Sequence, residues 1–278
     1  MRKHLSTILL VLILFAGILI LLYPTLSDYW NSFHQSRAIA SYIEQVSEVD
    51  PEEYRAEWEA AIAYNETLPF KPNRFELSEE EKEEYRNLLN PMGTGIMGYI
   101  EIAKIRCTLP IYHGTDEAVL QNSIGHIEGS SLPTGGLGTH TVLSGHRGLP
   151  SAKLFTDLDK MEIGDLFVLR VMGEVMTYEV DQILTVLPYE MQALAIDPEA
   201  DLCTLITCTP YGINTHRLLV RGRRIENEEA EQSIHVIADA TQIDPWLMAP
   251  LFAVPLLILW VIAVMITTGR RSRGGRHE

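Results

Sequence analysis

The sequence predicts a mainly β domain, a closed or nearly closed barrel of seven or eight strands. From Gly98 onward, short runs rich in β-branched residues alternate with glycine, proline and aspartate, which is typical of strands joined by turns. Only two short helical patterns interrupt these runs. A closed sheet therefore fits the pattern better than a parallel α/β sheet. A helical segment precedes this domain, and an apolar run lies near each end of the chain.

The two apolar runs, residues 7–23 and 247–268, contain no charged residue. A helix needs about 20 apolar residues to cross a bilayer, within a range of about 17–25, so both runs are long enough to span. No small-x-small cleavage pattern follows the first run, which we interpret as an uncleaved anchor rather than a removed signal peptide. Basic residues precede the first run and follow the second. This arrangement predicts cytoplasmic termini and an extracellular domain between two spans.

The portion between the two runs is strongly acidic. Without the residues beyond the runs, it holds 16 lysines and arginines against 36 aspartates and glutamates, a net charge of −20. That charge argues against a nucleic-acid partner and against a peripheral grip on anionic lipid. The lipid bilayer is therefore expected as a partner through the spans. The three cysteines are an odd number, which leaves at least one thiol free.

The segment before the strands, residues 24–96, predicts helices. Apolar side chains recur at helical spacing on both sides of a break at Asp50 and Pro51. Further along, Ser78 is followed three residues later by Glu81, the pattern of a capping box. The glutamate-rich face of that helix is expected to be solvated.

The search for chemistry leads to the thiols, because the sequence contains no metal-binding spacing and no glycine-rich phosphate loop. No cofactor and no metal are expected. Cys208 ends the predicted strand 202–208 and precedes a turn. Because side chains alternate along a strand, Cys203 and Cys208 point apart, which opposes a disulfide between them. Cys208 is then either a nucleophile at a strand end or a small buried side chain, and the local pattern favours neither.

A cysteine nucleophile needs an acid or base beside it and a donor that stabilises negative charge. His146 is the best candidate histidine, because it follows a predicted strand in a polar segment flanked by glycines. Arg217 begins the strand after Cys208, where a hairpin would bring it back beside the thiol. Arg221 shares its face and is the alternative. Either arginine could instead form a salt bridge on this acidic domain.

Three segments resemble the sortase family. Residues 204–208, TLITC, look like the Thr-Leu-x-Thr-Cys motif of sortases, and Arg217 lies nine residues on, where the family has its arginine. The segment GTHTVLSGHRG around His146 resembles the family's histidine segment. From about residue 97 to residue 224 the sequence looks like class C sortases, the pilin-polymerising enzymes of Gram-positive bacteria. Two membrane anchors also suit that class.

The resemblance implies a sortase-like barrel and a Cys-His-Arg site. Cys208 would attack the Thr–Gly bond of an LPxTG-like sorting signal and form a thioacyl enzyme. His146 would protonate the leaving amine and later deprotonate the incoming one, while Arg217 would hydrogen-bond the substrate backbone and the oxyanion. Thr207 would support the site from the other face of the strand. The acceptor would be a lysine amine of a pilin, so the expected partners are pilins or surface proteins with LPxTG-like signals.

The predicted organisation of the chain combines the residue patterns with the resemblance to sortases. It consists of a cytoplasmic N-terminus (1–6), a transmembrane anchor (7–23), a helical, lid-like region (24–96), a catalytic barrel (97–226), a linker (227–246), a second transmembrane helix (247–268) and a basic cytoplasmic tail (269–278).

One feature departs from the class C pattern. Class C enzymes often carry a lid with an Asp-Pro-aromatic motif, but the corresponding stretch, residues 67–79, lacks that triplet. Phe70 and Phe75 are the aromatic residues there that could replace it. Two alternatives stay open: a cell-wall-anchoring sortase that uses a peptidoglycan amine, and a non-catalytic, membrane-tethered module that binds sorting signals.

Overall fold

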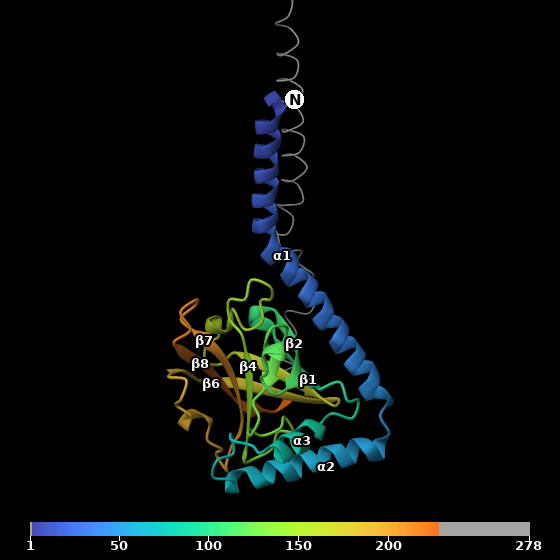
Figure 1. Ribbon diagram of the computed structural model, residues 1–278. Helices are drawn as coiled ribbons and strands as arrows, with labels where there is room; N and C mark the ends of the chain where they lie inside the picture. The colour runs from blue at the N-terminus through green and yellow to red at the C-terminus, as the bar shows by residue number, and fades with distance from the viewer. Residues whose placement is uncertain (1, 228–278) are drawn as a thin grey trace, which may run out of the picture. The chain divides into compact units, whose positions relative to one another are not determined.

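An eight-stranded sheet closes into a barrel in the computed structural model, which describes residues 2–227 (Figure 1). The strand order is β1-β2-β3-β4-β7-β8-β6-β5, and β5 pairs with β1 to close the sheet. The strands are β1 (Ile96–Ile102), β2 (Cys107–His113), β3 (Ile124–His126), β4 (Thr139–Gly145), β5 (Leu166–Val171), β6 (Glu174–Val186), β7 (Asp201–Thr209) and β8 (His216–Ile225). The closed barrel predicted from the strand pattern is confirmed.

The barrel has one large core inside and a smaller apolar cluster on its outer face. In β7 the side chains alternate, so Cys203 and Leu205 lie in the interior core while Ile206 lies outside. Ile206 forms the outer cluster with three other buried side chains, which we call the outer patch: Val142, Leu194, Ile206 and Leu219. The patch covers neighbouring positions of β4, β7 and β8, so the outside of these strands is apolar close to the candidate site.

Two strand pairs are parallel, and one of them positions the site. β2 pairs with β3 and β4 pairs with β7 in parallel, whereas the other neighbours are antiparallel. Parallel pairing brings the carboxyl ends of β4 and β7 to the same edge of the barrel. The chain between β4 and β7 includes β5 and β6. It returns to the edge of the barrel at which β4 began before β7 begins there.

The N-terminal region is helical. It contains α1 (Arg2–Glu48), α2 (Pro51–Thr67), η1 (Leu68–Phe70) and α3 (Glu79–Asn87), and shorter helices lie within the barrel region: η2 (Ala103–Ile105), α4 (Glu117–Leu120), η3 (Leu158–Lys160) and η4 (Gln192–Leu194). The break before α2 agrees with the sequence, since Asp50 caps α2 by accepting from Glu52 N at 2.8 Å. The capping box of Ser78 and Glu81 is confirmed at the start of α3.

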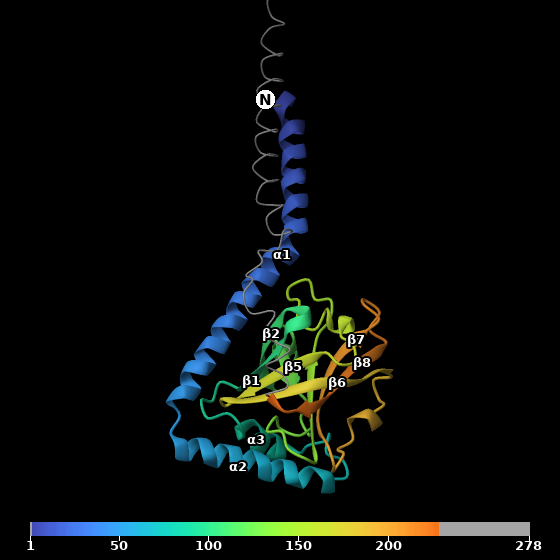
Figure 2. The same cartoon turned by 180° about the vertical axis from the view of Figure 1, so that it is seen from behind.

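The helices from residue 28 onward pack on the barrel. Tyr42 of α1 donates its hydroxyl to Met97 O at 2.9 Å and accepts from Met172 N at 2.7 Å, so it connects two barrel segments. α2 and α3 lie beside each other at one end of the barrel, where Tyr64 and Tyr85 are in ring contact (Figure 2). The N-terminal region from Asp28 onward therefore belongs to the same compact unit as the barrel.

Among the described helices, α1 is long and apolar enough to cross a bilayer, with a mean hydropathy of 2.7 in its most apolar window. Its large apolar side chains, such as Leu12 and Ile20, are exposed. Residues up to Ser27 belong to a separate compact unit from those that begin at Asp28. The apolar helix agrees with membrane anchoring. The predicted second span, its basic tail and the linker from residue 228 lie outside the described residues, so the two-span topology stays a prediction.

Candidate active site

Cys208 and Arg217 are direct partners across two strands. β7 and β8 form an antiparallel pair in which Cys208 lies opposite Arg217. Residues at opposing positions project to the same side of a sheet, so the thiol and the guanidinium share the outer face. Both residues are half-buried. The hairpin expected from the sequence thus brings this arginine back beside the cysteine.

His146 arrives at the same edge from β4. It is the first residue after that strand, and β4 and β7 pair in register as far as Ser144 and Ile206. The pairing thus stops two residues before His146 on β4 and two residues before Cys208 on β7, so the two residues lie at the same edge of the barrel.

Backbone contacts on both sides fix the position of His146. Thr207, which is 2% exposed, donates from Oγ1 to Gly145 O at 2.8 Å. On the other side, Phe155 N donates to the carbonyl of His146 at 3.1 Å. Thr207 points into the barrel, opposite to Cys208, so it holds the end of β4 without occupying the outer face.

The charge of Arg217 is not neutralised by a carboxylate within the described part of the chain. Its Nη1 donates to two backbone carbonyls of its own loop, Asn214 O at 3.3 Å and His216 O at 3.1 Å. The guanidinium has five N–H donors, so several are left for another acceptor. It can therefore donate to the oxyanion that develops on a carbonyl group attacked by the neighbouring sulfur.

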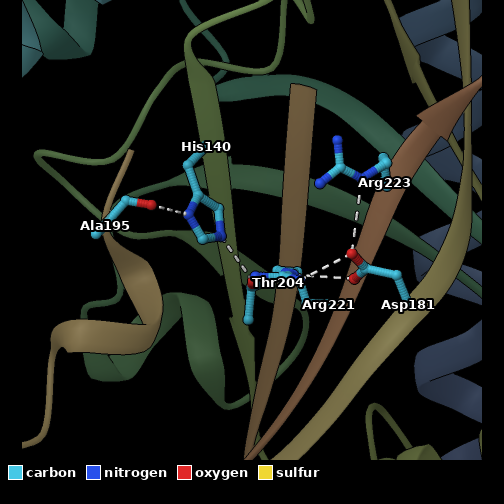
Figure 3. Close-up of polar contacts among 6 residues, drawn as sticks. All are labelled: His140, Asp181, Ala195, Thr204, Arg221 and Arg223. Carbon is cyan, nitrogen blue, oxygen red and sulfur yellow. Dashed lines mark hydrogen bonds and ion pairs between the residues drawn. The ribbon is translucent and has the colours of Figure 1, made fainter. Parts of the chain in front are cut away.

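Arg221, the alternative arginine, has a different partner. Its Nε and Nη2 donate to the two carboxylate oxygens of Asp181 at 2.9 and 2.8 Å, and Arg223 approaches the same carboxylate at 3.8 Å (Figure 3). In the β7–β8 register it lies opposite Thr204, four residues from Cys208. The structure therefore distinguishes the two candidates and brings Arg217, not Arg221, to the thiol.

The other two cysteines are enclosed. All three thiols are free, but Cys107 is 8% exposed and Cys203 is fully buried. Burial raises the pKa of Cys107 to about 12, and it raises the pKa of Cys203 well above its ordinary value. A thiolate is the reactive form of cysteine, so these two positions disfavour it. Cys208, which is half-buried at the barrel edge, differs from both.

Comparisons with known proteins identify the family. Residues 100–225 match the family model described as the sortase domain. Sortase C1 from Streptococcus agalactiae is 50% identical in sequence, with a TM-score of 0.66 over 69% of this chain and 99% of that one. The chain belongs to the sortase family. Sortases are cysteine transpeptidases, and the family predicted from the three motifs is confirmed.

Other relatives agree with this assignment. Sortase C from Streptococcus pneumoniae is 47% identical, with a TM-score of 0.62 over 68% of this sortase and 97% of that chain. Sortase C from Clostridium perfringens, solved with the C-terminal cell wall sorting motif, is 41% identical, with a TM-score of 0.61 over 69% of this sortase and 99% of that chain. Sortase D from Bacillus subtilis (strain 168) is 30% identical over 131 residues, 46% of this sortase and 63% of that protein. The match therefore spans less than two thirds of the curated relative.

An aromatic residue of the expected lid stretch contacts the outer patch of this sortase. Phe75 packs against the patch, whereas Phe70 is 86% exposed. The neighbouring Arg74 stacks on the Phe75 ring, 4.3 Å from its centroid, and donates to Gly129 O at 2.8 Å and Leu194 O at 2.5 Å. The segment is thus fastened to the same outer face as Cys208, although it lacks the Asp-Pro-aromatic triplet.

The connection from β6 to β7 is fastened to that face by His140. Its Nδ1 lies 2.8 Å from Ala195 O and its Nε2 lies 2.7 Å from Thr204 Oγ1 (Figure 3). Burial lowers the pKa of His140 to about 4, so the ring is neutral at pH 7. A neutral ring satisfies both contacts when Nδ1–H donates to Ala195 O and the Thr204 hydroxyl donates to Nε2.

A cavity of about 580 Å³ lies between this connection and the outer sides of β6 and β8. Its lining includes Leu184, Val186, Ala193, Ile196 and Arg221. No local pattern in the sequence marks Arg74 or His140, because both act by contacting segments far away in the sequence. Among the described residues, no three His, Cys, Asp or Glu side chains gather so that they could hold a metal ion.

Proposed function

We propose that this sortase cleaves an LPxTG-like sorting signal between Thr and Gly and transfers the acyl group to a lysine amine of a pilin subunit. The observation that supports it most directly is the pairing of Cys208 with Arg217 across β7 and β8. The register of β4 and β7 adds His146 at the same edge. Nucleophile, proton carrier and oxyanion donor are the three groups that acyl transfer by a cysteine requires.

In the first half-reaction, the Cys208 sulfur attacks the carbonyl carbon of the signal's threonine. Arg217 donates hydrogen bonds to the oxyanion that develops on that carbonyl, which lowers the barrier because the positive charge is already in place. The C–N bond then breaks, and His146 gives its proton to the leaving amine of glycine. A thioester between Cys208 and the threonine carbonyl results.

In the second half-reaction, an amine attacks the thioester. His146 takes a proton from the incoming amine, and the Cys208 thiolate leaves as the new amide bond forms. When the amine belongs to a lysine side chain, the product is an isopeptide bond. The proton that His146 gives to the glycine amine is replaced by the one that it takes from the incoming amine, so the sulfur and the imidazole return to their starting state and atoms and charge balance without a cofactor.

Thr207 is the supporting residue in this proposal. Its hydroxyl is bonded to Gly145 O, one residue before His146, from a side chain that adjoins Cys208 in the sequence. This contact adds to the β4–β7 pairing and joins the residue before Cys208 to the residue before His146. Thr207 sets the spacing of the two groups and does not itself touch substrate.

The pilin acceptor and the topology complete the proposal. The similarity to three sortase C enzymes supports a sorting signal as the acyl donor, since one of them was solved with a sorting motif. The same similarity supports a pilin as the acceptor. The apolar α1 supports an anchor in the bilayer, and the basic residues outside the two apolar runs support cytoplasmic termini. The barrel then faces the cell exterior, where sorting signals and pilins are exported.

Mass spectrometry of the intact enzyme tests the chemistry. The full chain in detergent is incubated with a peptide that contains an LPxTG-like signal. We expect an adduct on Cys208 whose mass equals the peptide up to threonine, and no adduct on the Cys208→Ala variant. Binding of the peptide without cleavage would instead support the non-catalytic module.

A competition between two amines tests the acceptor. Purified pilin and a peptidoglycan-precursor amine are supplied separately to the acyl enzyme, and the products are analysed by mass. The proposal expects an isopeptide-linked pilin product to form faster. Transfer to the wall-precursor amine alone would show a cell-wall-anchoring sortase.

A further inference from the structure

Two loops meet beside the proposed catalytic residues. One follows His146 at the end of β4, and the other joins β7 to β8 after Cys208. They touch where the ring of Tyr211 lies on the backbone of Gly148. A Cβ atom at Gly148 would lie 2.7 Å from Tyr211 Cε2 and 3.0 Å from Cζ, so the ring, which is 61% exposed, would have to move to admit a side chain there.

Arg147 extends the same contact. Its guanidinium carbon lies 5.8 Å from the centroid of the Tyr211 ring, within the range of a cation–π interaction. The other side of this guanidinium pairs with Asp159, with Nη2 at 2.5 Å from Oδ2. The Arg147 side chain is only 10% exposed, although it is charged and lies at the protein surface. Tyr211 therefore covers the two residues that directly follow His146.

The imidazole of His146 has no hydrogen-bond partner among the described residues. Catalytic histidines are commonly oriented by a carboxylate or carbonyl bonded to their second ring nitrogen. Here the orientation depends on the backbone. Thr207 and Phe155 fix the residues up to His146, and Tyr211 holds the residues after it.

We infer that Tyr211 is a positioning residue that holds the His146 loop against the loop that follows Cys208. The inference rests on the proposed transpeptidase function. Tyr211 is three residues from the sulfur in sequence, and its ring contacts the second residue after the imidazole. One side chain thus joins the loop after the imidazole to the loop after the sulfur, and proton transfer between these groups depends on their relative placement.

Two variants of Tyr211 test this role. We expect Tyr211→Ala to lower kcat about tenfold, because the chemical step depends on the relative position of the imidazole and the sulfur. We expect less than about a twofold change in KM for the sorting peptide, because the residues that bind this peptide are unchanged. Tyr211→Phe keeps the ring and is expected to keep most of the activity. Ile213→Ala removes another exposed apolar side chain from the same loop and is the matched control.

A double-mutant cycle tests the contact itself. Gly148→Ala places a methyl group against the ring, at a backbone φ of +76° that also strains alanine. The steric part of its effect disappears when the ring is absent. We therefore expect Gly148→Ala to lower kcat less in the Tyr211→Ala background than in the wild type. Additive effects would show that the ring and the glycine do not act together.

A readout without substrate separates this inference from the proposed function. The rate of Cys208 alkylation by iodoacetamide at pH 7 is measured in the wild type and Tyr211→Ala. We expect Tyr211→Ala to lower this rate about threefold, because the imidazole no longer holds its place beside the sulfur. An unchanged rate together with a raised KM would overturn the inference and make Tyr211 a substrate contact. Failure of the wild type to form an acyl adduct would overturn the proposed function, whatever the alkylation shows.

Discussion

At the scale of single residues, the three thiols differ in their surroundings rather than in their chemistry. Cys107 and Cys203 lie in the interior core, where burial raises the pKa of each thiol. Cys208 is one place beyond an inward-facing threonine and so falls on the outer face. The strand alternation separates a candidate nucleophile from two structural cysteines.

Selective alkylation follows from this difference. In the native protein we expect iodoacetamide to modify Cys208 at least about a hundredfold faster than Cys107 or Cys203, because buried thiols form little thiolate and are shielded from the reagent. Peptide mapping after timed labelling measures the three rates. Equal rates in the folded protein would contradict the assignment, and labelling in denaturant provides the control in which all three react.

The two arginines offer a matched pair of substitutions. We expect Arg217→Ala to lower kcat/KM about 10²- to 10³-fold, the usual cost of losing one oxyanion donor. Arg221→Ala removes the ion pair with Asp181. Arg221 lies opposite Thr204, four residues before Cys208 on β7, so the effect of this substitution on kcat/KM should stay within a few-fold. Steady-state cleavage of a sorting peptide compares them. A larger loss at Arg221 would reverse the assignment.

At the scale of elements, the site depends on how β4 is attached to β7. The parallel pair is short, and β4 ends at Gly145, so His146 lies just beyond the ladder. The Thr207 hydroxyl extends the pairing by one contact on the inner side of the barrel. A buried, satisfied hydrogen bond of this kind fixes register as well as stability.

Substitution of Thr207 tests that attachment. Thr207→Val keeps the shape but leaves the buried carbonyl of Gly145 without this donor, which should cost about 1–3 kcal/mol of unfolding free energy. We also expect kcat to fall, because His146 is then free to shift relative to Cys208. Thr207→Ser keeps the hydroxyl and should preserve both quantities. Chemical denaturation and peptide cleavage measure the two effects, and an unaltered kcat in a stable Thr207→Val variant would disprove the coupling.

The segment that bears Phe75 is a second element with a consequence for the site. Its ring covers the outer patch, which includes Ile206, two residues before Cys208 on the same face. A donor peptide that approaches along this face competes with the ring for the same apolar surface. The absence of the Asp-Pro-aromatic triplet therefore does not leave this face uncovered.

Removal of the ring should make the patch accessible. We expect Phe75→Ala to speed acyl-adduct formation at low peptide concentration by about two- to tenfold. The gain is modest because, in the wild type, the peptide has to displace only the apolar contact of the Phe75 ring with the outer patch. Phe70→Ala, which removes an exposed ring from the same region, is the control. Stopped reactions analysed by mass give both rates. Equal rates in the two variants would show that Phe75 does not restrict access.

At the scale of the whole molecule, buried histidines set the response to acid. His126 lies in the interior beside Tyr85, and its contacts are with the Tyr85 hydroxyl at 2.8 Å and Ser131 O at 2.8 Å. Burial lowers the pKa of His126 to about 3 and that of His140 to about 4. The unfolded chain binds protons at these residues near pH 6.5, whereas the folded chain does not.

The fold should therefore lose stability as the pH falls from about 6.5 toward 4, by about 1.4 kcal/mol per pH unit for each such histidine. Thermal unfolding between pH 7 and pH 5 measures the decline. The His140→Asn variant keeps a donor toward Ala195 O but lacks the imidazole of His140. Its loss of stability over this pH range should therefore be smaller by the contribution of that one histidine. A melting temperature that does not change over this range would contradict the prediction.

The sequence by itself determined the local features of this sortase. Residue spacing predicted the strands, the break before α2, the capping box of α3 and the opposite faces of Cys203 and Cys208, because each depends on neighbours in the chain. The motifs around Cys208, His146 and Arg217 also identified the family, which the comparisons confirmed.

The tertiary structure alone decided which distant segments meet. The register of β8 on β7 places Arg217 rather than Arg221 beside the thiol, and packing of the segment before α3 on the barrel brings Phe75 onto the outer patch and Arg74 to Leu194 of that patch. The contact of Tyr211 with Gly148 likewise joins loops more than 60 residues apart. Local periodicity shows which side of a strand a residue faces, but it does not fix the partner strand or its register. Those follow from how the whole barrel packs.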